Sequence, residues 1–309
     1  MTTPVEEAVA ELRTLRDLIR WGVSRLHEVD AHFGHGTDNA VDEAVYLALH
    51  ALHLPPDVLD PYLDARLTET ERRAVAELLW RRVSERQPAA YLIREAWFAG
   101  LAFYVDERVL VPRSPIAELI EARFEPWVDP DAVTAVLDIG TGGGCIAVAA
   151  ALAFPGARVD AADVDPDALA VAEENIRRFG VEGRVRAVRS DLFEGVAGND
   201  YDIIVSNPPY VDRPAMEALP AEYRHEPAAA LAAGEEGLDL VLPMLRDAAA
   251  HLRPGGILVV EVGHSAEALQ RRLPEVPFHW LEFERGGEGV FLLTEADLRS
   301  HADRLAESA

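Results

Sequence analysis

The feature that most constrains the fold of this chain is the alternation of short apolar runs with helical segments from about residue 134 onward. Five runs have the length of a buried strand, and helical spacing separates each from the next. They are 134–140, 158–164, 185–191, 201–207 and 256–263. Strands that alternate with helices are typical of a parallel, doubly wound sheet, because each helix returns the chain across a face of the sheet. We therefore expect a Rossmann-like α/β fold.

The last two strand candidates refine this fold. Residues 278–284 and 289–295 are joined by a Gly-Gly connection that is too short for a crossover. The two strands must therefore form an antiparallel hairpin. A parallel sheet of seven strands that ends in an antiparallel pair is not the pattern of a dehydrogenase. For the polar segment 296–309 we expect a frayed helix.

The chain before the sheet has a different pattern. Residues 1–90 show apolar side chains at helical spacing and predict an all-helical N-terminal domain. Residues 91–115 contain short β-like pieces rich in aromatic and β-branched side chains, which predict a β-hairpin linker. Residues 116–309 then form the α/β domain.

Composition limits the chemistry of the chain. Its formal net charge is −25 over 309 residues, and all 29 basic residues are arginine. The absence of lysine excludes a P-loop lysine, a Schiff base and a lysine general base. The acidic charge repels a phosphate backbone and attracts a basic partner, although an acid excess serves solubility equally well. We expect no sequence-specific binding of nucleic acid.

The cysteine, histidine and hydropathy patterns argue against a disulfide-bonded, metal-binding, secreted or membrane protein. Cys145 is the single cysteine, so no internal disulfide or multi-cysteine metal cluster forms, and we interpret this residue as a buried packing residue. The ten histidines lack ligand spacing, which predicts no metal site. The N-terminus carries acids where a secretory signal has a basic start, and no run approaches a membrane span. We expect a soluble, cytoplasmic protein with no membrane partner; the sequence does not indicate an oligomeric state.

A glycine-rich loop follows the first strand of the α/β domain. The segment 138–144 reads Asp-Ile-Gly-Thr-Gly-Gly-Gly and leads into a helix. Glycine lets the backbone approach a ligand, and the helix N-terminus offers free N–H groups. Asp138 precedes the first glycine by two residues and suits an ammonium group, which S-adenosylmethionine has. S-adenosylmethionine would therefore suit this loop as a cofactor.

Acidic residues also end the next two strands. Asp163 lies about 20 residues after the glycines, where a carboxylate accepts hydrogen bonds from ribose hydroxyls. Asp165 is its rival, but it precedes Pro166 and is expected to cap the following helix. Asp191 and Leu192 follow the third strand and are expected to contact the adenine amino group and ring.

A stiff motif follows the fourth strand. Residues 201–206 run directly into Asn207-Pro208-Pro209-Tyr210. The prolines end strand pairing and stiffen the loop, which holds Asn207 at the carboxyl end of a strand, where α/β sheets bind ligands. Together with the glycine loop, this motif resembles that of the protein N5-glutamine methyltransferases, which have the class I S-adenosylmethionine-dependent fold. The resemblance covers nearly the whole chain.

The segment 90–120 is similar to the branch of this family that modifies large-subunit ribosomal protein three (uL3). Arg113 is followed by Ser114 and Pro115, whereas the release-factor branch has a PRPETE-like run there. The runs EYRHEPAAALAAGEEGLD and EVG are further resemblances. The resemblance implies methyl transfer to N5 of a glutamine in uL3, a basic protein that is free or assembling, with substrate recognition by the helical domain and catalysis by the α/β domain.

The resemblance implies that S-adenosylmethionine is the cofactor and is bound through Asp138, Gly140, Thr141, Gly142 and Gly144. It also implies that the four-residue motif binds the substrate amide and that Asn207 borders the cofactor as well. Elementary chemistry agrees, because a glutamine amide must place two N–H groups on acceptors in a site without water. The Asn207 side-chain oxygen and the Pro208 carbonyl would accept one each, and Tyr210 would pack on the amide plane. We assign no general base. His225-Glu226 is interpreted as a turn, and Glu261 as a residue that lines the pocket or satisfies backbone groups.

Three alternatives remain open. A nucleic-acid adenine methyltransferase uses a similar loop on a planar NH₂ group, but it must hold a phosphate backbone and flip a base. A release-factor methyltransferase would have the same chemistry on another protein. A ribosome-associated binding module would keep the fold without activity and would fail to bind S-adenosylmethionine.

Overall fold

The computed structural model describes residues 2–56 and 58–308 and divides into two compact units. The first unit comprises the chain up to Ala96 together with Pro220–His225. The second unit comprises Trp97–Leu219 and the chain from Glu226 onward. The division shows that a short segment beyond the fourth sheet strand belongs to the N-terminal unit, which the sequence pattern does not indicate.

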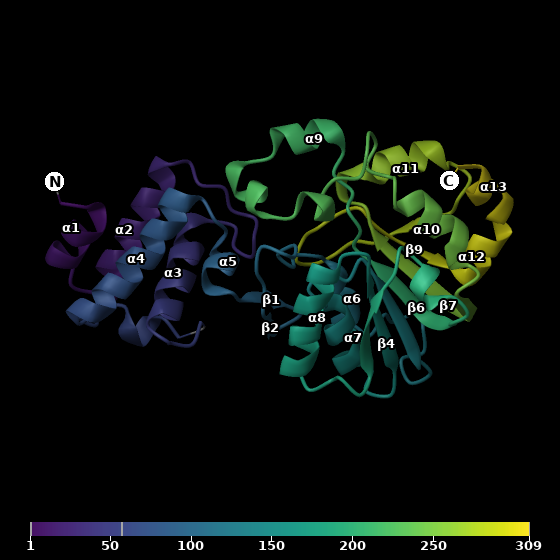
Figure 1. Cartoon of the computed structure of the whole chain (residues 1–309), viewed down its shortest axis with the longest axis horizontal. Coiled ribbons are helices and arrows are strands. Elements are labelled where there is room, and N and C mark those ends of the chain that lie inside the picture. The colour runs from purple at the N-terminus through teal and green to yellow at the C-terminus, as the bar shows by residue number, and fades with distance from the viewer. Residues whose placement is uncertain (1, 57, 309) are drawn as a thin grey trace. The chain divides into compact units, whose positions relative to one another are not determined.

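The first unit is a helical bundle. Its helices are α1 (Pro4–Glu11), α2 (Leu15–Glu28), α3 (Ala40–Ala51), α4 (Glu69–Glu85) and α5 (Ala89–Ile93), with a 3₁₀ turn at Asp60–Tyr62 (Figure 1). Threonines cap the first, second and fourth helices through capping boxes, which satisfy free N–H groups of the first turn. The apolar stripes of α2, α3 and α4 form one buried core. Gly22 lets α2 approach α4 closely, because a Cβ there would lie 2.8 Å from Leu79.

A buried carboxylate fixes the segment Pro220–His225 within the helical unit. The side chain of Glu222 is fully buried and accepts hydrogen bonds from the Arg86 guanidinium at 2.7 and 3.1 Å and from the His32 N–H at 3.1 Å. Arg82 lies 3.3 Å from the same carboxylate. These donors lower the pKa of Glu222 to about 2, although burial alone would raise it.

The second unit contains a seven-stranded sheet in the order β5-β4-β3-β6-β7-β9-β8. The strands are β3 (Ala135–Ile139), β4 (Arg158–Asp163), β5 (Val185–Arg189), β6 (Tyr201–Ser206), β7 (Leu252–Glu261), β8 (His279–Trp280) and β9 (Val290–Thr294). The first five are parallel, and β9 pairs antiparallel with both β7 and β8. The predicted parallel sheet with an antiparallel end is confirmed.

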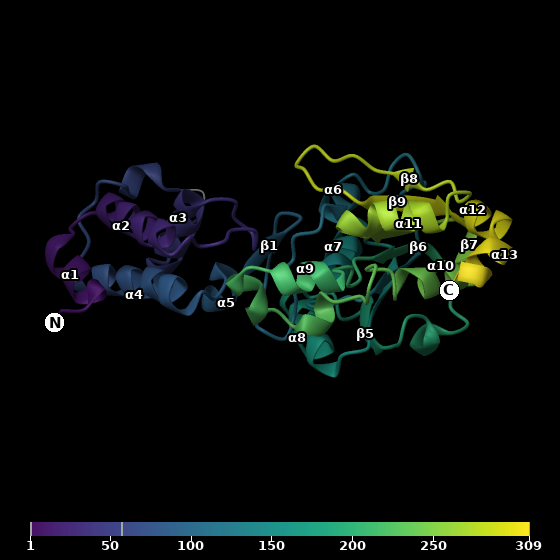
Figure 2. The same cartoon turned by 90° about the horizontal axis from the view of Figure 1, so that it is seen from above.

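Both faces of the sheet are covered by helices (Figure 2). One core contains side chains of α6 (Ile116–Glu121), α7 (Cys145–Ala153) and α8 (Pro166–Arg178). The other contains side chains of α10 (Val241–Ala248), α11 (Ala266–Arg272), α12 (Glu295–Ser300) and α13 (Ala302–Ser308). Consecutive residues of β6 alternate between the two cores, as a central strand requires. A smaller helix, α9 (Arg213–Ala218), follows β6 along the chain.

Several segments differ from the sequence expectation. The strand predicted at 278–284 is reduced to the two residues of β8. The strand pair β1 (Ala96–Phe98) and β2 (Leu101–Phe103) is shorter than the predicted linker, and the chain after Phe103 continues without a strand to α6. The polar end is not frayed, because Leu298 of α12 and Leu305 of α13 are about 1% exposed in the second core.

The strand register brings the carboxyl ends of the parallel strands to one edge. Ile139 of β3 lies opposite Ala162 of β4 and Ser206 of β6, and Ser206 lies opposite Val260 of β7. The glycine loop, Asp163, Asn207 and Glu261 therefore all follow or end strands at the same edge of the sheet.

Candidate active site

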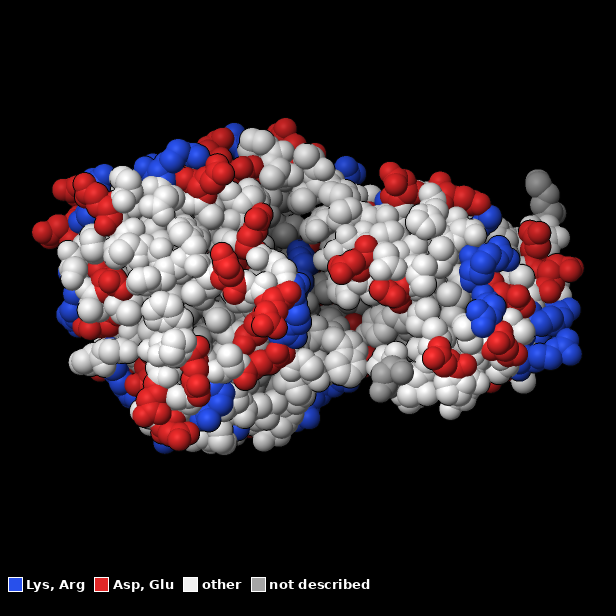
Figure 3. All heavy atoms as spheres, turned by 180° about the vertical axis from the view of Figure 1, so that it is seen from behind, with Lys and Arg blue, Asp and Glu red and all other residues white. Residues whose placement is uncertain are grey.

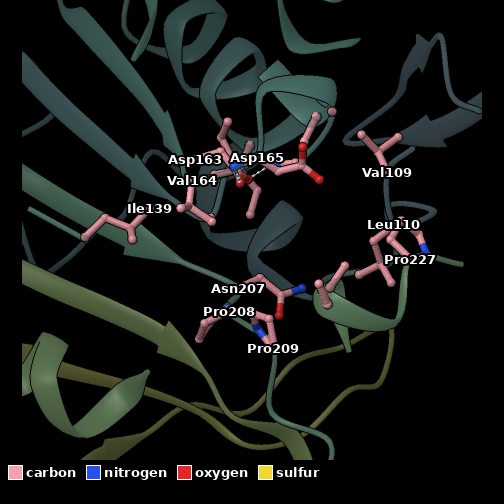
Figure 4. Close-up of a pocket in the computed structure, with 18 of the residues that line it drawn as sticks. Val109, Leu110, Ile139, Asp163, Val164, Asp165, Asn207, Pro208, Pro209 and Pro227 are labelled. Atoms are coloured by element: carbon pink, nitrogen blue, oxygen red, sulfur yellow. Dashed lines mark hydrogen bonds between the residues drawn. The ribbon is translucent and has the colours of Figure 1, made fainter. Parts of the chain in front are cut away.

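A cavity in the second unit lies at the carboxyl edge of the sheet. The loops after β3, β4, β5 and β6 line it, together with the segment 108–114 and Pro227. Figure 4 shows Asp163 and Asn207 on the sheet side of this cavity, with Val109, Leu110 and Pro227 across from them. Much of the lining is apolar, which suits a site that excludes water from a reacting amide.

The glycine loop takes a backbone conformation that other residues rarely adopt. Gly140 and Gly144 have φ values of +69° and +78°. A Cβ at Gly144 would lie 3.1 Å from the Cβ of Ala172 on α8, so glycine is needed there for packing as well as for conformation. Gly140, Thr141, Gly142 and Gly143 line the cavity, whereas Gly144 does not.

Asp138 lies beneath this loop and is fully buried. Its Oδ2 accepts hydrogen bonds from the Thr141 hydroxyl at 2.6 Å and from the Ala147 N–H at 3.1 Å. Its Oδ1 has no hydrogen-bond partner among the described residues. Burial is the largest influence and raises the pKa of Asp138 to about 7. Asp138 does not line the cavity. Its hydrogen bonds to Thr141 and Ala147 support the glycine loop from below, and its Oδ1 is left to accept a hydrogen bond from a donor such as an ammonium group.

Asp163 ends β4 and lines the cavity. Its two oxygens accept hydrogen bonds from the N–H groups of Gly142, at 2.9 Å, and Asp165, at 3.0 Å. Burial raises the pKa of Asp163. Asp165 caps α8 by accepting from the Asp167 N–H at 2.8 Å, which confirms the prediction of a helix cap. Asp163 therefore links the second strand to the glycine loop within the cavity wall.

The loop after β5 forms another part of the wall. Ser190, Asp191 and Leu192 all line the cavity. Leu192 has a φ of +45°, and its carbonyl accepts a 2.7 Å hydrogen bond from the Ser190 hydroxyl. This fixed turn presents an acid and an apolar side chain together, the pair of groups expected to contact an adenine.

Asn207, Pro208 and Pro209 line the cavity from the end of β6. Buried Ser206 anchors this strand end by donating a 2.7 Å hydrogen bond to the Ile139 carbonyl of β3. In Figure 4 the amide of Asn207 is directed toward the side of the cavity formed by Leu110 and Pro227. Residues 207–209 and the glycine loop thus line one cavity.

Tyr210 lies differently from the rest of its motif. It is not among the residues that line the cavity, and its hydroxyl donates a 2.9 Å hydrogen bond to Glu261 at the end of β7. The expectation that Glu261 lines the pocket or satisfies backbone groups is therefore wrong, because its described partners are two hydroxyls. The second is that of Ser114, which donates at 2.5 Å.

The segment 108–114 contributes residues that sequence reasoning did not assign to the site. Arg113 lines the cavity and donates hydrogen bonds of 2.6 and 2.9 Å to Glu226, which also accepts from the Val111 N–H at 3.0 Å. The side chain of Glu226 is fully buried. The departure from the release-factor pattern at Ser114-Pro115, directly after Arg113, was the available signal, since it marked this segment as specific to one branch.

Cys145 borders the cavity but is 6% exposed. Burial raises the pKa of its thiol, which keeps it protonated and agrees with a packing residue. Among the described residues there is no cluster of three or more side chains that could hold a metal ion. In the same part of the chain no helix is long and apolar enough to cross a membrane.

The comparisons with known proteins agree with this architecture. A family model described as the methyltransferase small domain matches residues 126–224. Among solved structures, the catalytic domain of hMettl16 matches 81% of this chain and 89% of its own, with a TM-score of 0.50 and 18% identity, a similarity of fold. The sheet order and the matching family model define the protein as a class I S-adenosylmethionine-dependent methyltransferase.

Relatives with higher identity give the family. The ribosomal protein uL3 glutamine methyltransferase of Bordetella pertussis is 52% identical over 94% of this chain and 98% of its own length. Those of Xanthomonas campestris and Neisseria meningitidis are 52% and 50% identical, over 98% and 94% of this chain and 98% and 96% of their own lengths. The chain belongs to the ribosomal protein uL3 glutamine methyltransferase family, so the resemblance inferred from the sequence is confirmed.

Proposed function

We propose that this protein transfers a methyl group from S-adenosylmethionine to the side-chain amide nitrogen of a glutamine in ribosomal protein uL3. One observation carries the proposal: the Asn207-Pro208-Pro209 segment and residues 140–143 of the glycine loop line the same cavity. A planar amide acceptor and a methyl donor would therefore meet there. The family membership selects glutamine in uL3 as the acceptor.

The cavity offers suitable groups for each part of the cofactor. The free Oδ1 of Asp138 beneath the glycine loop suits the ammonium group, and main-chain N–H groups of the loop and of the α7 N-terminus suit the carboxylate. Asp163 would accept from the ribose hydroxyls, and Asp191 with Leu192 would contact the adenine. When bound, the cofactor supplies an electrophilic methyl group on a positively charged sulfur.

The acceptor side of the cavity must orient a weak nucleophile. The nitrogen lone pair of an amide is delocalised, so its two N–H groups need fixed acceptors that aim the nitrogen at the methyl group. The Asn207 side-chain oxygen and the Pro208 carbonyl would take one N–H each, and both would stabilise positive charge that develops on nitrogen. The proline pair keeps this geometry rigid. No general base is required by this arrangement.

Recognition of the substrate protein is assigned to the helical unit. It carries a buried core of its own, which provides a stable platform for a binding surface. With a net charge of −25, the enzyme attracts a basic ribosomal protein, free or during assembly. Such a substrate places the reaction in the cytoplasm.

The proposal is tested with labelled S-adenosylmethionine and three acceptors in parallel: uL3, a peptide release factor and duplex DNA. Mass spectrometry then locates the methyl group. Methylglutamine in uL3 alone supports the proposal. Label on the release factor keeps the chemistry and overturns the substrate, and label on DNA overturns both. Failure to bind the cofactor would indicate a binding module without activity.

A further inference from the structure

Two sequence runs that the proposed reaction does not use surround Tyr210 and hold it in place. The run Glu261-Val262-Gly263 supplies a hydrogen-bond acceptor and a glycine, and a Cβ at Gly263 would lie 2.6 Å from the Tyr210 ring. Gly237 belongs to the other run, and a Cβ there would lie 2.2 Å from the Tyr210 carbonyl oxygen. Side chains at either glycine would displace the tyrosine.

The main chain of Tyr210 is held as well. Its carbonyl accepts a 2.9 Å hydrogen bond from the Ser265 hydroxyl, and its ring packs edge-on against His264, with 5.9 Å between ring centroids. The tyrosine is thus fixed by backbone, ring and hydroxyl contacts immediately after the three residues that line the cavity. Its position sets where Asn207 and the prolines can lie.

The Glu261 carboxylate also connects Tyr210 to the loop that contains Ser114. Its Oε1 accepts from the Tyr210 hydroxyl at 2.9 Å, and its Oε2 accepts from the Ser114 hydroxyl at 2.5 Å. The Ile116 N–H donates to the Ser114 oxygen at 3.2 Å, which leaves the hydroxyl proton of Ser114 for Glu261. Ser114 itself lines the cavity beside Arg113. Glu261 is 5% exposed, so water does not compete strongly for these bonds.

We propose that Glu261 is a positioning residue for the acceptor amide: its carboxylate fixes the Asn207–Tyr210 loop against the Arg113–Ser114 segment on the cavity wall. This inference rests on the proposed function and deepens it. Ser114-Pro115, which follows Arg113, is the point where the chain departs from the release-factor pattern. Glu261 therefore connects a branch-specific segment to the motif that orients the amide, and it acts through Tyr210 and Ser114 without touching the substrate.

The central test compares Glu261→Gln with Tyr210→Phe and with the double variant. Glutamine keeps the shape of the side chain but offers only one acceptor oxygen for two hydroxyls. We expect Glu261→Gln to lower kcat on uL3 between about 10-fold and 100-fold, because small misplacement of a reacting group is costly. The affinity for S-adenosylmethionine, measured by calorimetry, should stay within about twofold. Tyr210→Phe in the Glu261→Gln background should add little, since the two residues act as one unit.

A second measurement does not depend on the acceptor. Hydrogen exchange of the amides of Asn207 and Tyr210 should be faster in Glu261→Gln than in the wild type, and unchanged in Glu288→Gln, an exposed glutamate between β8 and β9. Equal exchange in all three proteins, or additive losses of kcat in the double variant, would overturn the inference. A wild type that leaves uL3 unmodified would overturn the proposed function instead, and the exchange rates would still decide the role of Glu261.

The pH profile separates positioning from simple stability. Burial raises the pKa of Glu261, and protonation removes one acceptor from its pair of hydroxyls. We expect kcat of the wild type to fall on the acid side as Glu261 takes up a proton, and this decrease to be absent in Glu261→Gln. An identical acid limb in both proteins would contradict the role.

Discussion

In the helical unit, Arg82 Nε lies 2.6 Å from Glu43 Oε1, and about 1% of each side chain is exposed. The Arg82 guanidinium also donates a 2.8 Å hydrogen bond to the His32 carbonyl and lies 3.3 Å from the Glu222 carboxylate. Glu43 accepts a further hydrogen bond from Thr37 at 2.8 Å. This buried charge network links α3, α4 and the segment Pro220–His225. Separating these elements would leave a buried charge without its partner, which is energetically costly.

Removal of the arginine should destabilise the helical unit. Arg82→Met leaves Glu43 without its buried counter-charge, and we expect a loss of about 3–5 kcal/mol in the free energy of unfolding. Arg81→Met is the matched control, since Arg81 forms an exposed pair with Glu85 on the same helix and should cost less than about 1 kcal/mol. Hydrogen exchange of the α3 and α4 amides measures the difference. Equal protection in both variants would show that the network does not stabilise the bundle.

Asn207→Ala should remove methyl transfer and leave cofactor binding nearly intact. The amide oxygen would orient the acceptor and stabilise charge that develops on it, and loss of one such group lowers kcat by about 10²–10³-fold. The affinity for S-adenosylmethionine should stay within about twofold. Asn207→Asp keeps one acceptor oxygen at the same place and should retain more activity than alanine. Parallel losses of turnover and cofactor affinity in the alanine variant would instead mean that the loop is structural.

Binding of S-adenosylmethionine should release a proton below neutral pH. Burial raises the pKa of Asp138 from 3.8 to about 7, so at pH 6.5 much of the free enzyme carries a protonated Asp138. An ammonium group at its free oxygen favours the ionised form and expels that proton. Calorimetry in two buffers with different ionisation enthalpies measures the release. Asp138→Asn should abolish it, whereas Asp167→Asn, at an exposed acid, should not; a wild type without proton release would refute the assigned contact.

The same raised pKa predicts a pH-dependent stability of the cofactor-free enzyme. The folded state holds the Asp138 proton more tightly than the unfolded chain does. The stabilisation that comes from this tighter proton binding is therefore fully present below about pH 4 and is lost as the pH rises through about 7. Asp138→Asn should flatten this part of the stability profile in denaturant titrations. A profile of the same slope in both proteins would assign the dependence to other groups.

The sequence predicted the sheet and the glycine loop because both depend on local pattern. Strand and helix periods are visible in the chain, and glycines mark a backbone that must take positive φ, as Gly140 and Gly144 do. Asp163 at the end of β4 and Asp191 shortly after β5 are likewise visible once the strands are placed. These features require no knowledge of distant partners.

The buried glutamates could not be predicted in the same way. The hydrogen-bond partners of Glu222, Glu226 and Glu261 lie more than 50 residues away in sequence. Nothing near a glutamate in the chain distinguishes one that meets an arginine in the core from one in solvent. The prediction of a frayed helix after β9 was wrong for a related reason. In this polar segment, Leu298 and Leu305 pack into the second core and hold two short helices against the sheet.

Ionic strength should affect the reaction with uL3 through the charge of the enzyme. Acidic side chains cover more of the face in Figure 3 than basic ones, in keeping with the net charge of −25. A basic substrate would be steered toward such a surface, and salt screens this attraction beyond about 10 Å at 0.1 M. We expect kcat/KM to fall as salt rises from about 50 to about 500 mM, with kcat at saturating uL3 nearly constant. A short neutral glutamine peptide serves as the control acceptor, and its kcat/KM should change little. An unchanged kcat/KM for uL3 would mean that its capture depends on surface shape rather than on charge.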